Sequence, residues 1–173
     1  MRKRYFFFDI DGTLAAGPIM GRYIPESTKR ALEILESEGH FLAICTGRLH
    51  AMGEGFMHEL GFQNMVADGG NSLTLNGEFL GIKPLDTQAC IDVIEECERL
   101  GVVWAISFDD SRRRLTRYAN YDALVHDSYM ETVVDPELDY RSIECFYKVY
   151  VICSPEEEAR IASLSKVPTA RFS

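Results

Sequence analysis

The fold is decided by residues 5–14, which read YFFFDIDGTL. The apolar run Tyr5–Phe8 predicts a strand that is buried on both faces, as in a parallel sheet covered by helices. Asp9 and Asp11 follow this strand, and their spacing of two places both side chains on one side of an extended chain. The dipeptide Gly12-Thr13 then allows a sharp turn and adds a hydroxyl group. Because open α/β sheets bind ligands at the carboxyl ends of their strands, the stretch predicts a site as well as a strand.

Two carboxylates this close repel each other unless they share a cation or a proton. A bare Asp-Gly pair is more often only a turn after a core strand. The full pattern of two acids, glycine and threonine directly after four apolar residues favours a functional site over a simple turn.

A second apolar run, Phe41–Cys45, ends in Thr46-Gly47-Arg48. A helix that opens at Pro25 and stops at Gly39 separates the two runs, and such a right-handed crossover makes the two strands parallel. A threonine at a strand end, followed by glycine and the start of a helix, suits an anion, since the hydroxyl and free backbone N–H groups can point at one phosphate. Thr46 alone fits a helix cap equally well. Its place one crossover from the two acids favours phosphate binding.

The rest of the chain predicts one further half-sheet and a second unit. A third strand over 64–67 and a loop over 68–71 precede two short strands joined by Asn76-Gly77, the strongest short hairpin signal. Pro84 marks the exit from a first domain over residues 1–83. Residues 84–173 then predict an α+β layer. Its expected elements are a helix from Asp86 or Thr87 to Leu100, a hairpin over 102–118, a weaker helix over Tyr121–Met130, a strand over Phe146–Cys153, a helix after the capping box at Ser154, and a last strand over Pro168–Ser173.

Composition excludes several classes of protein. The formal net charge is −9, whereas a nucleic-acid-binding protein needs a basic stripe. Residues 1–83 carry 8 Lys and Arg against 10 Asp and Glu, so the acidity lies mostly in the second domain. The 5 cysteines are odd in number and lie within apolar runs, which predicts reduced core thiols of a cytoplasmic protein. The first apolar run is too short for a signal peptide or a membrane span.

Asp9-Ile10-Asp11-Gly12-Thr13-Leu14 resembles the first motif of the haloacid dehalogenase (HAD) superfamily of phosphohydrolases, and Thr46-Gly47-Arg48 resembles its second. The resemblance follows family order along the chain and is to the Cof-like branch, whose members carry a large α/β cap. It implies an α/β fold, with a Rossmann-like half-core and its parallel sheet in residues 1–83. Residues 84–173 would then form an incomplete α+β cap.

The resemblance also implies roles for particular residues. Asp9 would attack phosphorus and form an aspartyl-phosphate, and Asp11 would protonate the leaving oxygen and then activate water. Mg²⁺ would bind the Asp9 carboxylate and the Asp11 main-chain carbonyl. The activity implied is hydrolysis of small phosphorylated metabolites such as sugar phosphates. The substrate-binding residues implied are Thr13, Thr46, Gly47, Arg48, Gly70 and Asn71.

The family's later lysine and acidic motifs have no counterpart here, so the chain is expected to lack the C-terminal half of the core. Residues 67–72 echo the acidic motif but lack its second carboxylate, and they fit a substrate-facing loop better. Asp68 touching a metal through water stays open as an alternative. We therefore expect weak metal binding and poor turnover. A phosphomutase and a non-catalytic phosphate-binding fragment remain alternatives.

Two further expectations follow. Without the missing strands, the aromatic first strand would keep an open edge and uncovered faces, which predicts either self-association or a compensating segment that covers the strand. Arg112, Arg113, Arg114 and Arg117 form a basic cluster that fits a solvated hairpin face, or alternatively a site for a second phosphate or acidic group.

Overall fold

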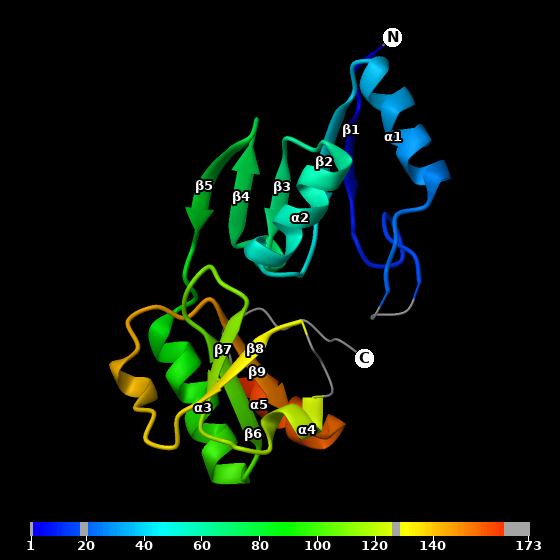
Figure 1. The fold of residues 1–173 in the computed structure, drawn as a ribbon. Coiled ribbons are helices and arrows are strands. Elements are labelled where there is room, and N and C mark those ends of the chain that lie inside the picture. Colours follow the sequence, from blue (N-terminus) through cyan, green and yellow to red (C-terminus); the bar gives the residue numbers. More distant parts are fainter. Residues whose placement is uncertain (1, 18–20, 126–128, 165–173) are drawn as a thin grey trace. The chain divides into compact units, whose positions relative to one another are not determined.

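The computed structural model describes residues 2–17, 21–125 and 129–164. The chain forms two compact units, Met1–Ile82 and Lys83–Ser173 (Figure 1). Each unit has its own sheet and its own core, and they are described in turn.

The first unit is an α/β layer built on a five-stranded sheet of order β1-β2-β3-β4-β5. β1, β2 and β3 are parallel, whereas β4 and β5 are antiparallel to their neighbours. In chain order the elements are β1 (Tyr5–Phe8), α1 (Glu26–Ser37), β2 (Phe41–Cys45), α2 (His50–Leu60), β3 (Met65–Ala67), the 3-10 turn η1 (Asp68–Gly70), β4 (Ser72–Leu75) and β5 (Glu78–Ile82). The predicted half-core with parallel strands is therefore confirmed.

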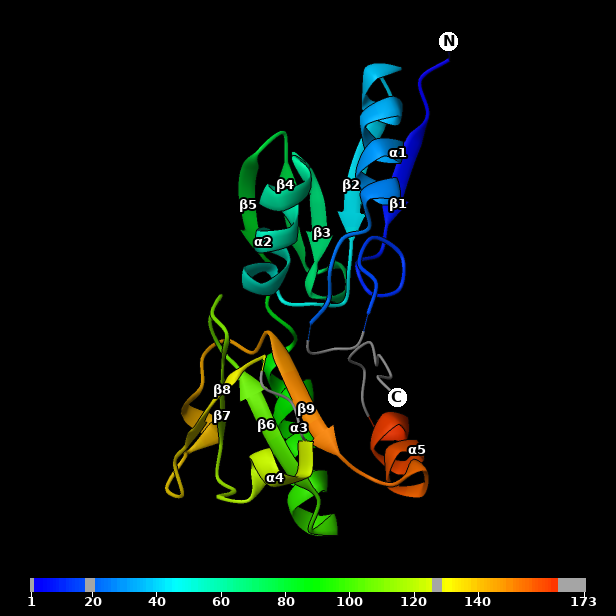
Figure 2. The same cartoon turned by 45° about the vertical axis from the view of Figure 1, so that its right-hand side comes forward.

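Both helices of the first unit cover the same face of its sheet (Figure 2). Leu32 of α1 and Met57 of α2 share one buried cluster with Ile44 of β2. This is the outcome expected when two successive right-handed crossovers run in one direction across a sheet. The opposite face has no helix among the residues that the structure describes.

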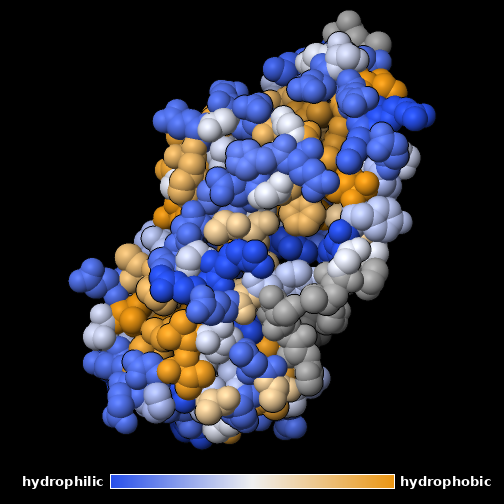
Figure 3. Space-filling model, viewed as in Figure 1, coloured by the Kyte–Doolittle hydropathy of each residue, from blue (hydrophilic) through white to orange (hydrophobic). Residues whose placement is uncertain are grey.

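The prediction that β1 is buried on both faces is wrong. Phe6 and Phe8 are half-buried on the helix side, but Tyr5 is 64% exposed and Phe7 is 60% exposed. β1 is also the edge strand, which agrees with the expected open edge. Figure 3 shows apolar side chains open to solvent at the end of the sheet that holds β5, and near the N-terminal strand as well.

The predicted Asn76-Gly77 hairpin is confirmed. Asn76 and Gly77 have φ values of 51° and 80°. A two-residue hairpin turn needs such left-handed values at both residues, because only then does the turn match the right-handed twist of the two strands. The turn joins β4 to β5, which is the last strand of this sheet in the described part of the chain.

The second unit is an α+β layer with a four-stranded sheet of order β8-β7-β6-β9. Its elements are α3 (Thr87–Leu100), β6 (Val103–Ser107), β7 (Arg113–Thr116), α4 (Tyr121–Val125), β8 (Glu131–Val134), the 3-10 turn η2 (Tyr140–Ser142), β9 (Lys148–Ile152) and α5 (Pro155–Leu164). Trp104 and Ile106 of β6 are fully buried in one cluster with Ile94 of α3 and Ile161 of α5.

Local signals set the ends of the long helices in this unit. The Asp86 carboxylate accepts a hydrogen bond from the Ala89 N–H at 2.8 Å, and Gly101 ends α3 in the left-handed conformation. At α5, Ser154 and Glu157 exchange hydrogen bonds as the capping box predicts, and these bonds lower the pKa of Glu157.

The prediction for residues 121–134 is partly wrong. Helix α4 is described over Tyr121–Val125, Tyr129 and Met130 are not helical, and Glu131–Val134 forms β8, a parallel partner of β7 that was not predicted. The last predicted strand, Pro168–Ser173, lies outside the described residues.

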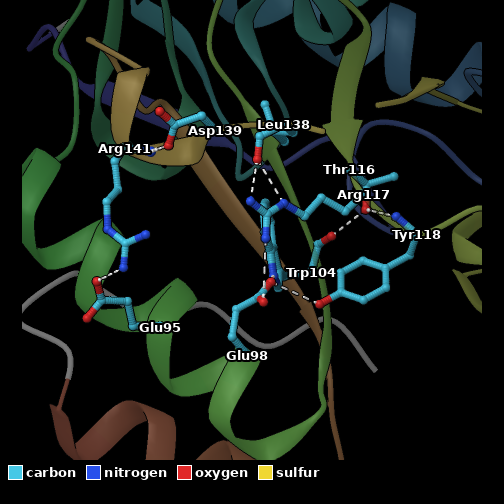
Figure 4. A network of polar contacts seen from close by, with 9 residues as sticks. All are labelled: Glu95, Glu98, Trp104, Thr116, Arg117, Tyr118, Leu138, Asp139 and Arg141. Atoms are coloured by element: carbon cyan, nitrogen blue, oxygen red, sulfur yellow. Dashed lines mark hydrogen bonds and ion pairs between the residues drawn. The ribbon is translucent and has the colours of Figure 1, made fainter. Parts of the chain in front are cut away.

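A polar network on the second unit surrounds Glu98 of α3 (Figure 4). Its carboxylate accepts hydrogen bonds from the Trp104 indole at 2.8 Å and from the Tyr118 hydroxyl at 3.2 Å. Burial and the neighbouring Glu98 charge raise the pKa of Tyr118 to about 12. Arg117 pairs with Glu98 and also donates to the main-chain oxygen of Leu138. These contacts connect α3, β6 and the segment before η2.

The basic cluster is divided between surface and core, so the expectation of one solvated hairpin face is wrong. Arg112 and Arg113 are exposed, but Arg114 is 1% exposed. Its guanidinium lies over the Tyr121 ring and donates to Thr132 and Asp122.

The cysteine prediction holds only in part. All five cysteines are free thiols, and Cys90 and Cys97 are buried as expected, with burial raising the pKa of each to about 12. Cys45 is exposed, because the last residue of β2 points away from the helices. Within the described ranges, none of the helices has the length and apolar character needed to cross a membrane.

Candidate active site

Three parallel strands end side by side at one edge of the first sheet. Phe8 of β1 is in register with Ile44 of β2, and Cys45 of β2 is in register with Val66 of β3. The residues that directly follow the strands, Asp9, Thr46 and Asp68, therefore lie at the same edge. This is where the sequence predicted that the two acids and the threonine meet.

The turn after β1 leaves Asp9 exposed and buries its neighbour Ile10 completely. The Ile10 main-chain oxygen accepts from the N–H groups of Leu14 and Ala15, at 3.1 Å and 2.8 Å, which closes the turn. Gly12 has a φ of 78°, a conformation that only glycine adopts without strain. One Asp9 carboxylate oxygen accepts from the Ile10 N–H at 2.8 Å, so the carboxylate has a defined orientation.

Asp11 is held by two arginines. Arg48 donates from Nε and Nη2 to the two carboxylate oxygens, at 2.8 Å and 2.7 Å, a bidentate geometry that fixes both side chains. Arg22 forms a second ion pair with the same carboxylate. Arg22 comes from the loop after β1, which Ala16 and Tyr23 close by a pair of main-chain hydrogen bonds. Arg48 also lies over the Phe56 ring, 5.2 Å from its centroid.

Thr46 and Gly47 form the turn between β2 and α2. Thr46 is buried, and its hydroxyl oxygen accepts from the Arg48 N–H at 3.1 Å. That bond lies within the turn before the helix, because the N-cap residue of α2 is Leu49, so Thr46 is not the helix cap that was considered as the alternative to phosphate binding. The hydroxyl proton is still available for donation, because this bond uses only a lone pair of the oxygen. Gly47 is half-buried beside it.

Asp68, which directly follows β3, stabilises this turn through two hydrogen bonds. It is 3% exposed, and its carboxylate accepts from the His50 N–H at the first residue of α2, at 3.0 Å. Its own N–H donates to the Arg48 main-chain oxygen at 2.7 Å. The His50 ring stacks on Phe79 of β5 with centroids 3.9 Å apart. Asp68 thus supports the backbone that carries Arg48.

The remaining predicted substrate residues are less closely connected to the acids. Thr13 and Gly70 are exposed, and the Asn71 amide donates to the main-chain oxygen of Asp68 at 3.3 Å, within its own loop. Hydrogen bonds therefore join Asp11, Arg48 and Thr46 into one group, and Thr13, Gly70 and Asn71 lie at its periphery.

The acids match a divalent cation only in part. Carboxylate and main-chain oxygens are the ligands that Mg²⁺ prefers. However, the Asp11 carboxylate is bonded to two arginines, and within 2–17, 21–125 and 129–164 there is no group of three or more His, Cys, Asp or Glu side chains placed to hold a metal ion. The donor set is thus too small for a closed metal site.

Sequence reasoning missed Arg22, His50 and the supporting role of Asp68. Arg22 lies in a loop with no periodic pattern, so nothing in the sequence except its charge indicated that it would contact Asp11. Asp68 gave a weak signal, since an acid followed by two glycines after an apolar strand indicates a turn with left-handed backbone. The φ of Asp68 is indeed 54°.

A model of the haloacid dehalogenase-like hydrolases matches residues 6–164. A protein of Bacillus subtilis (strain 168) named "Putative phosphatase YkrA" is 22% identical over 179 residues, which cover 99% of this chain and 66% of that protein. Among solved structures, a hypothetical protein from Geobacillus kaustophilus HTA426 is 27% identical with a TM-score of 0.69, covering 94% of this chain and 62% of that one.

The HAD subclass IIB sugar phosphatase BT4131 has the same fold, with a TM-score of 0.70 at 22% identity, covering 95% of this chain and 64% of that one. The chain therefore spans less than two thirds of the length of these three proteins.

Proposed function

The chain belongs to the family of haloacid dehalogenase-like hydrolases, and from this premise we propose that it hydrolyses phosphoric monoesters of small metabolites. The observation that supports the proposal most directly is the exposed and oriented Asp9 carboxylate at the end of β1, next to the Asp11–Arg48 pair. Sugar phosphates are the substrate class that we propose, because BT4131, which is named a sugar phosphatase, has a similar fold.

In the proposed reaction the Asp9 carboxylate attacks phosphorus, and the bond from phosphorus to the substrate oxygen breaks. Asp11 gives its proton to that oxygen, so an alcohol leaves and Asp9 carries the phosphoryl group. Asp11 then takes a proton from water, whose oxygen attacks phosphorus and breaks the acyl-phosphate bond. Inorganic phosphate leaves and Asp9 is restored.

The two arginines on Asp11 impose a condition on this scheme. An Asp11 carboxylate that accepts hydrogen bonds from Arg48 and pairs with Arg22 carries no proton to give. At least one pair must open before Asp11 acts as an acid. A substrate phosphoryl group competes for the same guanidinium groups, because arginine forms the same bidentate pair of hydrogen bonds with a phosphate as with a carboxylate. We propose that substrate binding draws Arg48 from Asp11.

We propose that the phosphoryl oxygens are held by Arg48, by the Thr46 hydroxyl and by the Gly47 N–H. Thr13, Gly70 and Asn71 are the proposed outer contacts of the substrate. The bond from the Arg48 N–H to Thr46 supports the proposal, because it orients the hydroxyl without using its proton.

Phosphatases of this family generally use a divalent metal ion, and we propose Mg²⁺ on the Asp9 carboxylate and the Asp11 main-chain carbonyl. Such an ion would neutralise charge on the phosphoryl oxygens. With so few donors, we expect the described residues to bind it weakly.

We further propose that residues 1–83 are the N-terminal part of a catalytic core and that residues 84–173 belong to its cap. The division of the chain into units at Ile82 and Lys83 supports this assignment. We place the protein in the cytoplasm, with neither nucleic acid nor membrane as a partner.

Phosphorus NMR of sugar phosphates incubated with the protein and Mg²⁺ tests the function. We expect release of inorganic phosphate that is lost in the Asp9→Asn variant. Asp92→Asn is the matched control, because Asp92 is an exposed carboxylate on α3. Loss of activity in both variants, or retention in both, would contradict the role of Asp9.

The same spectra separate the alternatives. Transfer of the phosphoryl group to a second sugar hydroxyl would identify a phosphomutase. Shifts of the Thr46 and Gly47 amide signals with added phosphate, without turnover at any Mg²⁺ concentration, would identify a non-catalytic phosphate-binding protein. Either result would overturn the phosphatase proposal.

A further inference from the structure

Two cysteines of the second unit, Cys97 and Cys153, lie next to the same residue, Val102. Cys97 is in the last turn of α3, and its main-chain oxygen accepts a hydrogen bond from the Val102 N–H at 2.8 Å. Val103 of β6 is in antiparallel register with Ile152 of β9. Extending this register by one residue places Cys153 opposite Val102, at the Cα separation of about 5 Å that facing strand residues have.

Both thiols also lie on the same side of the second sheet. Residues of a strand alternate between the two faces, and facing residues of neighbouring strands share one face. Cys153 therefore shares the face of Val102, which is buried in one cluster with Cys97. Cys97 is fully buried in that cluster, and Cys153 is half-buried and packs against it. The two side chains thus reach the same part of the core.

The electrostatic surroundings of Cys97 agree with this placement. Burial is the main cause that raises the pKa of Cys97 to about 12, and the neighbouring Cys153 is the next. Cys90 lies two turns earlier on the same helix and is equally buried. At Cys90 the pKa is raised by burial and then by the charge of the Asp86 carboxylate. Cys97 is therefore the thiol of α3 that has Cys153 as its neighbour.

Two adjacent thiols can contribute to a metal site or form a disulfide. A structural zinc site needs four ligands, and the described ranges contain no group of three or more His, Cys, Asp or Glu side chains placed to hold a metal ion. A disulfide needs only the pair, with Cα atoms about 4.4–6.8 Å apart. A bond between Cys97 and Cys153 would fasten the last turn of α3 to the end of β9.

We propose that hydrogen peroxide oxidises this pair and forms a disulfide between Cys97 and Cys153. The O–O bond of the peroxide breaks, one oxygen is transferred to the Cys153 sulfur as a sulfenic acid, and the other leaves as water. The Cys97 sulfur then attacks the Cys153 sulfur, the S–O bond breaks, and the hydroxyl group leaves with the Cys97 proton as water. Two electrons pass from the two thiols to the peroxide. The proposal concerns the second unit alone and does not rest on the proposed phosphatase function.

The difference in burial sets the order of the two steps. A thiol reacts with peroxide as its thiolate, and a pKa of about 12 keeps Cys97 protonated at neutral pH. Cys97 is also closed to solvent, whereas Cys153 is half-buried. Oxidation therefore begins at Cys153, and Cys97 reacts only with the sulfenic acid beside it. This order predicts that removal of Cys97 traps the intermediate on Cys153.

Mass spectrometry of the whole chain after treatment with hydrogen peroxide tests the proposal. Remaining thiols are blocked with N-ethylmaleimide before digestion, so that no new disulfide forms during the analysis. We expect two peptides joined through Cys97 and Cys153, which dithiothreitol separates. Cys153→Ser should abolish this product. Cys145→Ser is the matched control and should leave it unchanged, because Cys145 is also half-buried but lies outside the cluster that holds Cys97.

Cys97→Ala tests the order of the steps. We expect dimedone, which labels sulfenic acids, to mark Cys153 about tenfold more in this variant than in wild type, where the disulfide consumes the intermediate. Circular dichroism confirms that each variant is folded. The proposal is overturned by a disulfide between any other pair of cysteines in the treated wild type. It is also overturned if Cys153 stays reduced, or passes to sulfinic acid without a disulfide, at a peroxide concentration that oxidises the exposed Cys45.

Discussion

β1 and β6 are both short apolar strands, yet the structure gives them opposite surroundings. β6 lies between β7 and β9, and its Trp104 and Ile106 are fully buried. β1 lies at the edge of its sheet, and its Tyr5 and Phe7 are largely exposed. In the second unit, α3 and α5 pack on β6, and Arg114 and Tyr121 are buried in the same unit. In the part of the chain that the structure describes, helices cover only one face of the first unit's sheet.

The difference shows that an apolar strand is buried on both faces only where other elements cover both of them; edge strand β1 contributes to its core through Phe8 alone, on the helix side. Where they are present, as at β6, the strand carries much of the stability of its unit. Where they are missing, the same kind of residues forms a surface that is available for association. Each of the following predictions tests one part of this contrast.

The largest effect is expected at Trp104. Trp104→Ala removes a fully buried ring that contacts Tyr118 and Tyr140, and it leaves Glu98 without the indole donor. We expect a loss of about 3–5 kcal/mol in the free energy of unfolding of the second unit. Hydrogen exchange measured by mass spectrometry follows the two units separately, which a single unfolding curve would not.

Phe7→Ala is the matched change in β1. Because Phe7 is 60% exposed, we expect a loss of about 0.5 kcal/mol or less in the first unit, in a sample dilute enough to be monomeric. Equal losses for Phe7→Ala and Trp104→Ala would contradict the contrast between the two strands.

The next effect concerns Arg114, the buried charged side chain of β7. Arg114→Met keeps most of the side-chain volume but removes the donors to Thr132 and Asp122, at 2.7 Å and 3.1 Å. We expect a loss of about 2 kcal/mol, less than for a fully buried pair because the Asp122 side chain is 64% exposed. Urea unfolding followed by tryptophan fluorescence measures it.

Its neighbour Arg113 provides the control. The Arg113 side chain is 48% exposed and pairs with Asp109 on the surface. Arg113→Met should therefore change stability by about 0.5 kcal/mol or less. If both substitutions cost the same, Arg114 has no special structural role.

A smaller effect is expected at the start of α5, which helps to cover the face of β6. Ser154→Ala removes the side-chain half of the capping box, and we expect a loss of about 1 kcal/mol. Ser163→Ala, near the other end of the helix, is the control and should be nearly neutral. Faster hydrogen exchange confined to α5 in the first variant only would agree with this account.

The features that sequence could predict are those set by near neighbours in the chain. The Asn76-Gly77 turn, the Ser154–Glu157 capping box and the Gly101 stop of α3 depend on a few consecutive residues, and all three are as predicted. The meeting of Asp11 with the β2–α2 turn joins residues far apart in the chain, and it was predictable for another reason: a right-handed crossover makes β1 and β2 parallel and brings their ends to one edge.

The features that sequence could not predict depend on partners far along the chain. The exposure of Tyr5 and Phe7 depends on which strands lie beside β1, and the four apolar residues carry no information about that. Arg22 reaches Asp11 from a loop without periodicity. Strand β8 forms because β7 offers it an edge, although its own short pattern is weak.

The smallest effect is a pH dependence within the second unit. The hydrogen bond from Thr132, and then the Arg114 charge, lower the pKa of Asp122. A carboxyl whose pKa is lower in the folded state than in the unfolded state stabilises the fold above its ordinary pKa, and this contribution is lost as the pH falls through the folded value. Wild type should therefore be more stable than Asp122→Asn at neutral pH, and the difference should shrink on acidification below the ordinary range of aspartate. Because Asp122 is mostly exposed, solvent keeps the difference small.

Urea midpoints measured for both proteins from pH 7 to pH 3 give the trend, with Asp92→Asn as a control for the loss of one exposed charge. A difference that grows as the pH falls would show that Asp122 is not stabilised by Arg114 and Thr132, and the link between β7 and β8 would then rest on the direct Arg114–Thr132 hydrogen bond and the backbone pairing.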